Sequence, residues 1–342
     1  MITIFSEDHH LHFGKYELIG GQFVTPFECP ARMDRVMERL REVNPGEVIA
    51  PRDYGLDPIG RVHSPDFIDF MQTAHDEWVK AHGDSDAIPT CWPNRTLRQI
   101  VPEKIDGKLS YYSFDAGTPI TSGTWKAVTS AANVSLTGVD LINTGETAVF
   151  SACRPPGHHA SADMYGGYCF FNNAAIATQS FLDSGAQRAA ILDVDYHHGN
   201  GTQAIFYDRC DVLYVSLHAD PAQEFPYFLG YADETGEKEG QGCNRNFPMR
   251  WGTQWPDYRE SLIKAINHIR NFSPDVLVIS LGVDTFEKDP ISQFRLKSDH
   301  FFKVGSTIAQ LKRPTLFIME GGYAVDDIGI NLVNVLTGFE DE

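Results

Sequence analysis

The chain has 342 residues, of which 42% are hydrophobic and 12% aromatic, a composition typical of globular proteins. No segment approaches the roughly 18 consecutive apolar residues of a membrane-spanning helix, so we expect no membrane span. The formal net charge of −18 disfavours binding to nucleic acid or to anionic membranes and favours cationic ligands, although solubility alone explains this charge at least as well.

The amino-terminal segment, MITIFSEDHH, has no basic region, no long apolar stretch and no small-residue cleavage site. We therefore expect no signal peptide and a cytoplasmic location. The six cysteines are widely spaced and include no CxxC pair. This spacing argues against a thiolate zinc site and against a disulfide framework, and it favours reduced thiols that lie mostly in the core.

The first third of the chain contains a long segment without regular periodicity, at about residues 76–123. It is rich in Pro, Gly, Trp and Tyr. Loops of this length are usually functional or disordered, and the aromatic and apolar content of this one disfavours disorder. We expect an ordered insertion that packs on another surface, such as that of a second subunit.

From about residue 148 onward, short apolar runs alternate with helical patterns. The expected strands are TAVFSAC, AAILDVD, DVLYVSL, DVLVISLGVD and PTLFIME, and the expected helices lie near 172–184, 201–208, 257–271, 299–311 and 326–337. This alternation implies right-handed βαβ units. The predicted fold class is α/β: one domain over residues 1–342, with a mostly parallel central sheet and helices on both faces.

Each of the five expected strands ends in a polar cluster. The clusters are RPPGHHA, DYHHGN, HAD, VDTFEKDP and EGGY, in chain order. In open parallel sheets, ligands bind outside the carboxyl ends of the strands. We therefore expect the five clusters to converge on one pocket.

Three residues in these clusters form a candidate metal site. The Asp-x-His spacing of Asp195 and His197 places both side chains on one side of an extended chain, and Asp284 approaches from a separate strand end. Two carboxylates and one imidazole suit Zn²⁺, Fe²⁺ or Co²⁺ and leave a position open for water and substrate. The alternative is a hydrogen-bonded polar cluster without a metal.

Three further residues are candidates for proton transfer and charge stabilisation. His158 and His159 follow a PPG turn, and one of them can take a proton from a metal-bound water while the other gives electrostatic support. Tyr323 follows two glycines and can donate its hydroxyl to an oxyanion. Paired histidines can also be purely structural, and a Tyr after Gly-Gly more often packs than catalyses.

Taken together, RPPGHHA, DVDYHHGNG, SLHAD, LGVDTFEKDP and EGGY resemble the arginase/deacetylase fold family, and specifically its zinc-dependent deacetylase branch. The resemblance covers most of residues 1–340 and includes RVHSPDFIDFM. Within the branch, the chain is most similar to the bacterial acetylpolyamine amidohydrolases, which share GGYCFFNNAA, MEGGY and the long segment before residue 123. The resemblance implies an active site at the carboxyl ends of the strands.

The resemblance also implies roles for individual residues. It assigns zinc to Asp195, His197 and Asp284, and the catalytic roles to His158, His159 and Tyr323. Asp193 is then the partner of His158 and sets its tautomer. Asn200 stands where the histone deacetylase pattern has Asp, and a neutral partner leaves His159 less basic and freer to act as general base and acid.

The family further implies a structural potassium ion and a substrate tunnel. The potassium ion lies near Asp193, Asp195, His197, Ser216 and Leu217, partly on backbone carbonyls. Residues implied to contact the substrate are Glu17, Asp106, Tyr168, Phe225 and Ile291. The insertion at residues 76–123 implies a homodimer whose tunnel entrance is narrowed.

The implied reaction is the zinc-dependent removal of acetyl groups from polyamines or diamines such as acetylputrescine, acetylcadaverine and acetylspermidine. A binuclear manganese ureohydrolase is disfavoured because Gly199 and Phe286 stand where further carboxylates are needed. A protein-lysine deacetylase remains open, since its chemistry is the same. A non-catalytic polyamine binder is the alternative from another class of protein.

Overall fold

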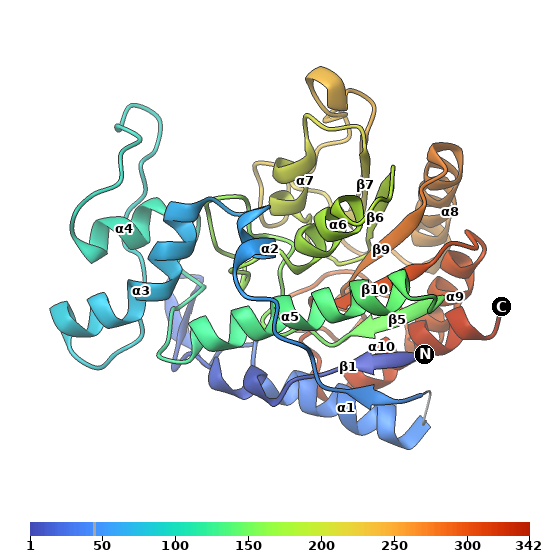
Figure 1. Ribbon diagram of the computed structural model, residues 1–342, viewed down its shortest axis with the longest axis horizontal. Helices are drawn as coiled ribbons and strands as arrows, with labels where there is room; N and C mark the ends of the chain where they lie inside the picture. Colours follow the sequence, from blue (N-terminus) through green and yellow to red (C-terminus); the bar gives the residue numbers. More distant parts are fainter. Residues whose placement is uncertain (44–45) are drawn as a thin grey trace.

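The computed structural model describes residues 1–43 and 46–342 and is built on an eight-stranded sheet (Figure 1). The strand order is β4-β1-β5-β10-β9-β6-β7-β8, and each pair of neighbours is parallel. The strands are β1 Ile2–Ile4, β4 Val48–Ile49, β5 Ala148–Ser151, β6 Ala189–Asp193, β7 Val212–Ala219, β8 Asn244–Met249, β9 Val276–Leu281 and β10 Thr315–Met319. A separate antiparallel hairpin pairs β2, Glu17–Ile19, with β3, Gln22–Val24.

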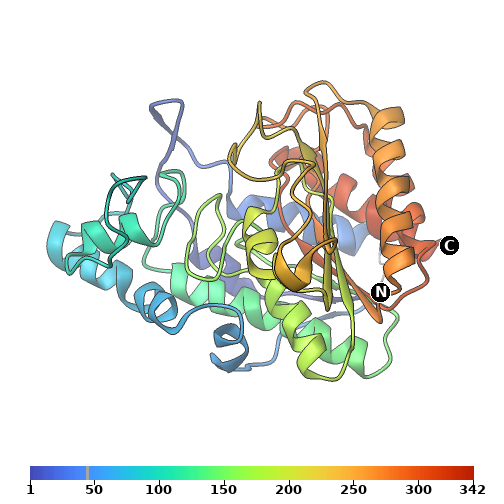
Figure 2. The ribbon, with the colours of Figure 1, turned by 90° about the horizontal axis from the view of Figure 1, so that it is seen from above.

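Helices cover both faces of the sheet (Figure 2). Helices α1, α8, α9 and α10 supply residues to the hydrophobic core on one face, and α5, α6 and α7 supply the core on the other. The helices are α1 Pro30–Val43, α2 Asp57–Gly60, α3 Pro65–His82, α4 Ile105–Tyr111, α5 Thr124–Asn143, α6 Asn173–Asp183, α7 Asn200–Phe206, α8 Trp255–Phe272, α9 Ser298–Ala309 and α10 Val325–Glu340, with the 3-10 helices η1 Glu7–Leu11 and η2 Lys238–Gly240.

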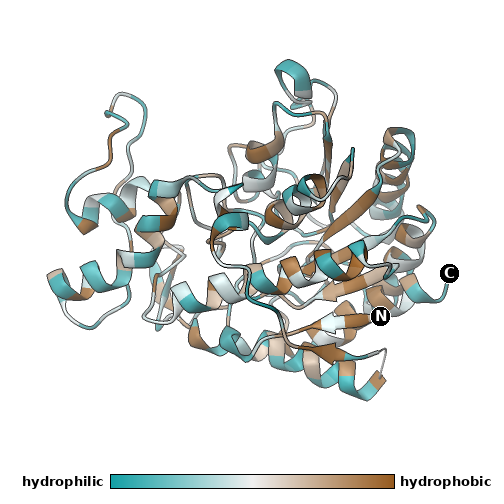
Figure 3. Cartoon of the chain, viewed as in Figure 1, coloured by the Kyte–Doolittle hydropathy of each residue, from teal (hydrophilic) through white to brown (hydrophobic). Residues whose placement is uncertain are grey.

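The alternation of side chains along each central strand explains why the sheet needs two helical layers. Ile191 and Val278 belong to the core with α5 and α6, whereas their neighbours Leu192 and Ile279 belong to the core with α8 and α10. All four are fully buried. Figure 3 shows the central strands as apolar and the outer sides of the helices as polar. A strand that is buried on both faces therefore appears in the sequence as a continuous apolar run.

The predicted sheet and its helices are confirmed. The five expected strands correspond to β5, β6, β7, β9 and β10, with ends that differ by at most three residues, and the five expected helices correspond to α6–α10. The sequence did not predict β1, β4 and β8, which lie toward the edges of the sheet. Among the described residues, no helix combines the length and the hydropathy that crossing a bilayer requires.

The segment at residues 76–123 contains more regular structure than its sequence indicates. It begins within α3, includes α4, and has a bridge between Ala87 and Ile120. The core that orders it joins Leu109 and Tyr112 to Phe67 and Phe70 of α3. Figures 1 and 2 place α3 and α4 beyond the carboxyl ends of the strands.

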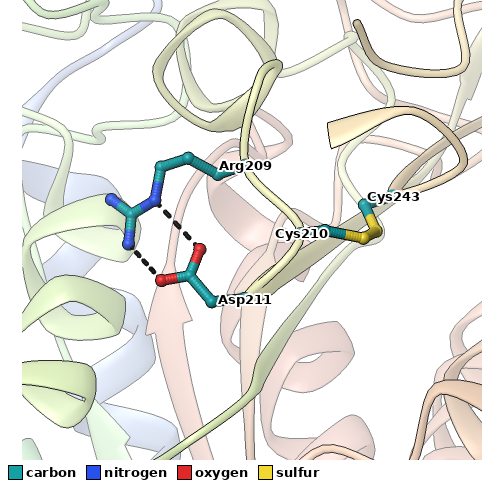
Figure 4. Close-up of a disulfide and its surroundings, with 4 residues drawn as sticks. All are labelled: Arg209, Cys210, Asp211 and Cys243. Atoms are coloured by element: carbon teal, nitrogen blue, oxygen red, sulfur yellow. Dashed lines mark hydrogen bonds and ion pairs between the residues drawn. A yellow bond between two sulfur atoms is a disulfide. The ribbon is translucent and has the colours of Figure 1, made fainter. Parts of the chain in front are cut away.

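The expectation of six reduced thiols, mostly in the core, is wrong for one pair. Cys210 and Cys243 form a disulfide, with Cα atoms 5.3 Å apart (Figure 4). The two cysteines lie just before β7 and β8. Because these strands are parallel neighbours, their first residues lie side by side, and the two cysteines meet although they are far apart in sequence. Of the free cysteines, Cys153 and Cys169 are buried, whereas Cys91 is exposed.

Candidate active site

The five polar clusters follow strands that are adjacent in the sheet. The order β5-β10-β9-β6-β7 brings together segments separated by up to about half of the chain. Since all these strands are parallel, their carboxyl ends lie at one edge of the sheet, as expected from the sequence. The segments after β5, β6, β9 and β10 supply the side chains described below, whereas the HAD cluster begins within β7 itself.

Asp195, His197 and Asp284 meet at the centre of this edge, and each is at most 7% exposed. His197 Nδ1 lies 3.1 Å from Asp284 Oδ2 and 3.5 Å from Asp195 Oδ1. Backbone N–H groups hold the carboxylates: Gly321 donates to Asp195 Oδ2 at 2.8 Å, and Tyr196 donates to Asp284 Oδ1 at 2.8 Å. The backbone therefore orients both carboxylates toward His197.

This donor set fits a divalent metal. Ligand atoms around a tetrahedral zinc ion lie about 3.3 Å apart when the bonds are about 2.0 Å, close to the separations between His197 and its two carboxylate neighbours. Burial and the charge of Asp195 raise the pKa of Asp284 to about 8. Two buried carboxylates that face each other need a cation, and a metal ion supplies one.

His158 and His159 lie beside the cluster of Asp195, His197 and Asp284, and the Nδ1 atom of each has a hydrogen-bond partner. His158 Nδ1 lies 3.0 Å from Asp193 Oδ2, and His159 Nδ1 lies 2.7 Å from Asn200 Oδ1. Since the amide oxygen of Asn200 can only accept, His159 Nδ1 carries the proton and its Nε2 is the basic atom. The carboxylate of Asp193 plays the same part for His158 and adds a negative charge.

The two histidines differ in electrostatics. Burial alone lowers the pKa of His158, but the charges of Asp193 and Asp195 outweigh it and raise the pKa to about 10. Burial lowers the pKa of His159 well below its usual value, and the neighbouring His158 and His197 lower it further. A neutral His159 beside a cationic His158 is the arrangement of a base beside an electrostatic support.

Tyr323 follows β10 and is 7% exposed. Burial raises the pKa of its hydroxyl well above the usual value, so the group stays protonated and can donate. The ring packs against Tyr168, with centroids 5.6 Å apart, and the Arg32 guanidinium lies 4.7 Å from its centre. Gly322, with φ +130°, provides a backbone conformation that other residues rarely adopt.

Comparison with known proteins agrees with this geometry. The chain matches the histone deacetylase domain over residues 26–338. The chain belongs to this family. It is 59% identical over 340 residues to acetylpolyamine amidohydrolase 2 of Pseudomonas aeruginosa and 49% identical over 338 residues to the acetylpolyamine amidohydrolase of Mycoplana ramosa, with 99% of each chain covered. A crystal structure of acetylpolyamine aminohydrolase from Burkholderia pseudomallei superposes with a TM-score of 0.93 at 36% identity, covering 99% of this chain and 98% of the other.

This histone deacetylase family chain is therefore a deacetylase-type hydrolase with the arginase/deacetylase fold, as predicted. Of the residues expected to contact substrate, Tyr168 packs against Tyr323 and Phe225 packs against His159. Phe225 lies 5.1 Å from the ring of His159 and 5.7 Å from that of Phe114. Ile291 lies on the loop after β9, where its N–H donates to Asp289 at 3.1 Å.

Glu17 and Asp106 lie in different environments. Glu17 is fully buried and lines a small cavity with Tyr168 and Glu28. Burial raises its pKa to about 7. Asp106, on α4, is exposed and pairs with His82 at 3.0 Å, away from the five strand ends. Within one chain, Glu17 therefore lies beside Tyr168 in the interior, whereas Asp106 lies at the surface.

The residues expected near potassium are contiguous in the structure. Asp193 and Ser216 are Cα partners in the ladder between β6 and β7, and Leu217 follows on β7. Asp195 and His197 continue from the end of β6. All five residues are buried.

Sequence reasoning missed several residues that support the deacetylase site. Asp289 accepts from the backbone N–H of Tyr323 at 2.7 Å. Glu28 bonds the guanidinium groups of Arg32 and Arg154, and Arg32 donates to the carbonyl of Gly322 at 2.5 Å. For Asp289 and Arg154 the signal was a charged residue without an assigned role in TFEKDP or RPPGHHA, whereas Glu28 and Arg32 lie outside these motifs.

Proposed function

We propose that this chain hydrolyses N-acetylated polyamines or diamines, such as acetylputrescine, acetylcadaverine and acetylspermidine, to acetate and the free amine. The observation that carries the proposal is the buried cluster of Asp195, His197 and Asp284 facing two histidines and a tyrosine. The substrate class follows from relatives named acetylpolyamine amidohydrolase at 49–59% identity over nearly the whole chain.

Asp195, His197 and Asp284 would hold a zinc ion, with Fe²⁺ or Co²⁺ as the other ions that the donor set suits. When bound, the ion supplies Lewis-acid polarisation of the acetyl carbonyl and makes a water molecule more acidic. A structural potassium ion would bind near Asp193, Asp195, His197, Ser216 and Leu217.

His159 acts as the general base. Its Nδ1–H donates to Asn200, so its Nε2 takes the proton from the attacking water. His158, held by Asp193, stabilises the negative charge that develops beside it. A histidine then returns the proton to the leaving nitrogen, because an amine anion is too basic to leave.

Tyr323 stabilises the tetrahedral oxyanion through its protonated hydroxyl. The walls of the site come from Tyr168, Phe225 and Ile291, which suit the methylene chain of an alkylamine. Glu17 places a carboxylate near Tyr168, and the net charge of −18 favours a cationic substrate.

The segment at residues 76–123 would complete the entrance in a cytoplasmic homodimer. Leu97, Ile100 and Val101 are 59%, 52% and 44% exposed, respectively, and these apolar side chains suit a contact with a second copy. Asp106 would reach the entrance of the partner subunit and contact the distal ammonium of the substrate.

The experiment is acetate release by the zinc-loaded protein from acetylputrescine, acetylcadaverine and acetylspermidine, beside an acetyl-lysine peptide. We expect faster turnover of the acetylated polyamines and diamines than of the peptide, and loss of this turnover in Asp284→Ala. Peptide preference would instead favour a protein-lysine deacetylase. Binding of acetylputrescine without acetate release would favour a non-catalytic binder.

A further inference from the structure

A second cluster of metal-ligating side chains lies on η1, outside the site described above. Glu7, His9 and His10 each place one ligand atom within 4.8 Å of the others. His10 Nδ1 lies 3.4 Å from a carboxylate oxygen of Glu7. This separation is close to the roughly 3.3 Å expected between two ligands of a tetrahedral zinc ion.

His9 gives an independent indication of a ligand. Its side chain is buried, and neither ring nitrogen has a hydrogen-bond partner among the described residues. The ring lies 3.8 Å from that of His10, centroid to centroid, and 5.4 Å from that of Phe5. A buried imidazole without a hydrogen bond costs free energy that a metal ion would recover.

We propose that Glu7, His9 and His10 bind a divalent transition-metal ion, with zinc as the best fit to two imidazoles and one carboxylate. Glu7 and His10 are exposed, so an ion reaches the site from solvent, while the buried His9 anchors it. Three protein ligands leave one position for water.

Asp34 of α1 supports this site from behind. Its Oδ1 lies 3.0 Å from His10 Nε2 and 3.7 Å from His9 Nε2. A carboxylate on the outer nitrogen of a ligating histidine fixes the tautomer and makes the ligand more basic. The bound ion would join η1 to α1.

The test is the zinc content of the full chain after dialysis at a fixed free zinc concentration. We expect two zinc ions per chain in the wild type and one in His10→Ala and in Glu7→Gln. His268→Ala, which removes an exposed histidine on α8, is the matched control and keeps both. Asp34→Asn should lower the affinity for the zinc ion on η1 by about 10- to 100-fold, measured in competition with a chelator.

Combination with Asp284→Ala separates this inference from the proposed function. Asp284→Ala should hold one zinc ion, and Asp284→Ala with His10→Ala should hold none. If His10→Ala and Glu7→Gln bind as much zinc as the wild type, the site on η1 is refuted. If Asp284→Ala binds as much zinc as the wild type, whereas His10→Ala and Glu7→Gln each bind one ion fewer, the assignment at the active site fails and the one on η1 stands.

Discussion

Replacement of Asp289 tests whether this carboxylate sets the position of Tyr323 by accepting a hydrogen bond from the backbone N–H of the tyrosine. Asp289 Oδ2 accepts from the N–H groups of Tyr323 at 2.7 Å and Ala324 at 3.2 Å, and its Oδ1 accepts from Ile291 at 3.1 Å. All these donors are backbone groups. Asp289 is therefore a positioning residue that acts through Tyr323.

The structure sets the expected size of the effect. A hydrogen bond to a charged group contributes about 1.5–3 kcal/mol, so the two bonds to Tyr323 and Ala324 contribute at most about 3–6 kcal/mol. Burial raises the pKa of Asp289 to about 6 because it disfavours the charged carboxylate, and this cost of burial offsets part of the contribution of the hydrogen bonds. Asn keeps the shape and one acceptor oxygen. We expect Asp289→Asn to lose about 1–3 kcal/mol of unfolding free energy and, if the tyrosine moves by about 1 Å, on the order of 10²-fold in kcat.

The assay is acetate release at saturating acetylputrescine for wild type, Asp289→Asn, Tyr323→Phe and the double variant, with urea unfolding of each. Tyr323→Phe alone should cost about 10² to 10³ in kcat. If Asp289 acts only through Tyr323, Asp289→Asn should cost little more in the Tyr323→Phe background. Asp233→Asn, at an exposed site, is the matched control.

Two results would refute this reasoning. Losses in kcat that multiply in the double variant would mean that Asp289 acts independently of Tyr323. A kcat of Asp289→Asn equal to that of the control would mean that the loop holds the tyrosine without the carboxylate.

Three further predictions concern the same region. Gly282→Ala should lower zinc affinity by at least about tenfold, measured by chelator competition, because its Cβ would collide with Asp195 Oδ2; unchanged affinity would show that the carboxylate can shift. Asn200→Asp should raise the pKa of His159 because a carboxylate would face its Nδ1–H, so the acidic limb of the kcat/KM profile should move to higher pH; an unmoved limb would exclude His159 as the base. Burial raises the pKa of Glu17 from 4.5 to about 7, so the folded state binds the proton more tightly and its stability falls as pH rises through this window. Glu17→Gln should therefore gain unfolding free energy relative to wild type between about pH 4 and pH 8 in urea titrations, and a constant difference would contradict the shift.

The sequence alone determined the central strands and the chemistry at their ends. AAILDVD and DVLVISLGVD are apolar on both faces because both faces of β6 and β9 are covered by helices. Each ends in an aspartate because the carboxyl end of a parallel strand leaves the core and opens into the site. A continuous apolar run followed by Asp and His is local information, so the sheet and the cluster of Asp195, His197 and Asp284 were predictable.

Tertiary structure decided what depends on partners distant in sequence. The strands β1, β4 and β8 lie toward the edges of the sheet, and β1 and β4 have only three and two residues, too few for a periodic pattern. Asp289 gained a role only when β9 and β10 became neighbours, and Cys210 met Cys243 because β7 and β8 begin together. The buried ring of His9, which has no hydrogen-bond partner among the described residues, could be recognised only in the folded structure. Hydrogen bonds, disulfides and burial are properties of pairs of segments, so no single stretch of sequence specifies them.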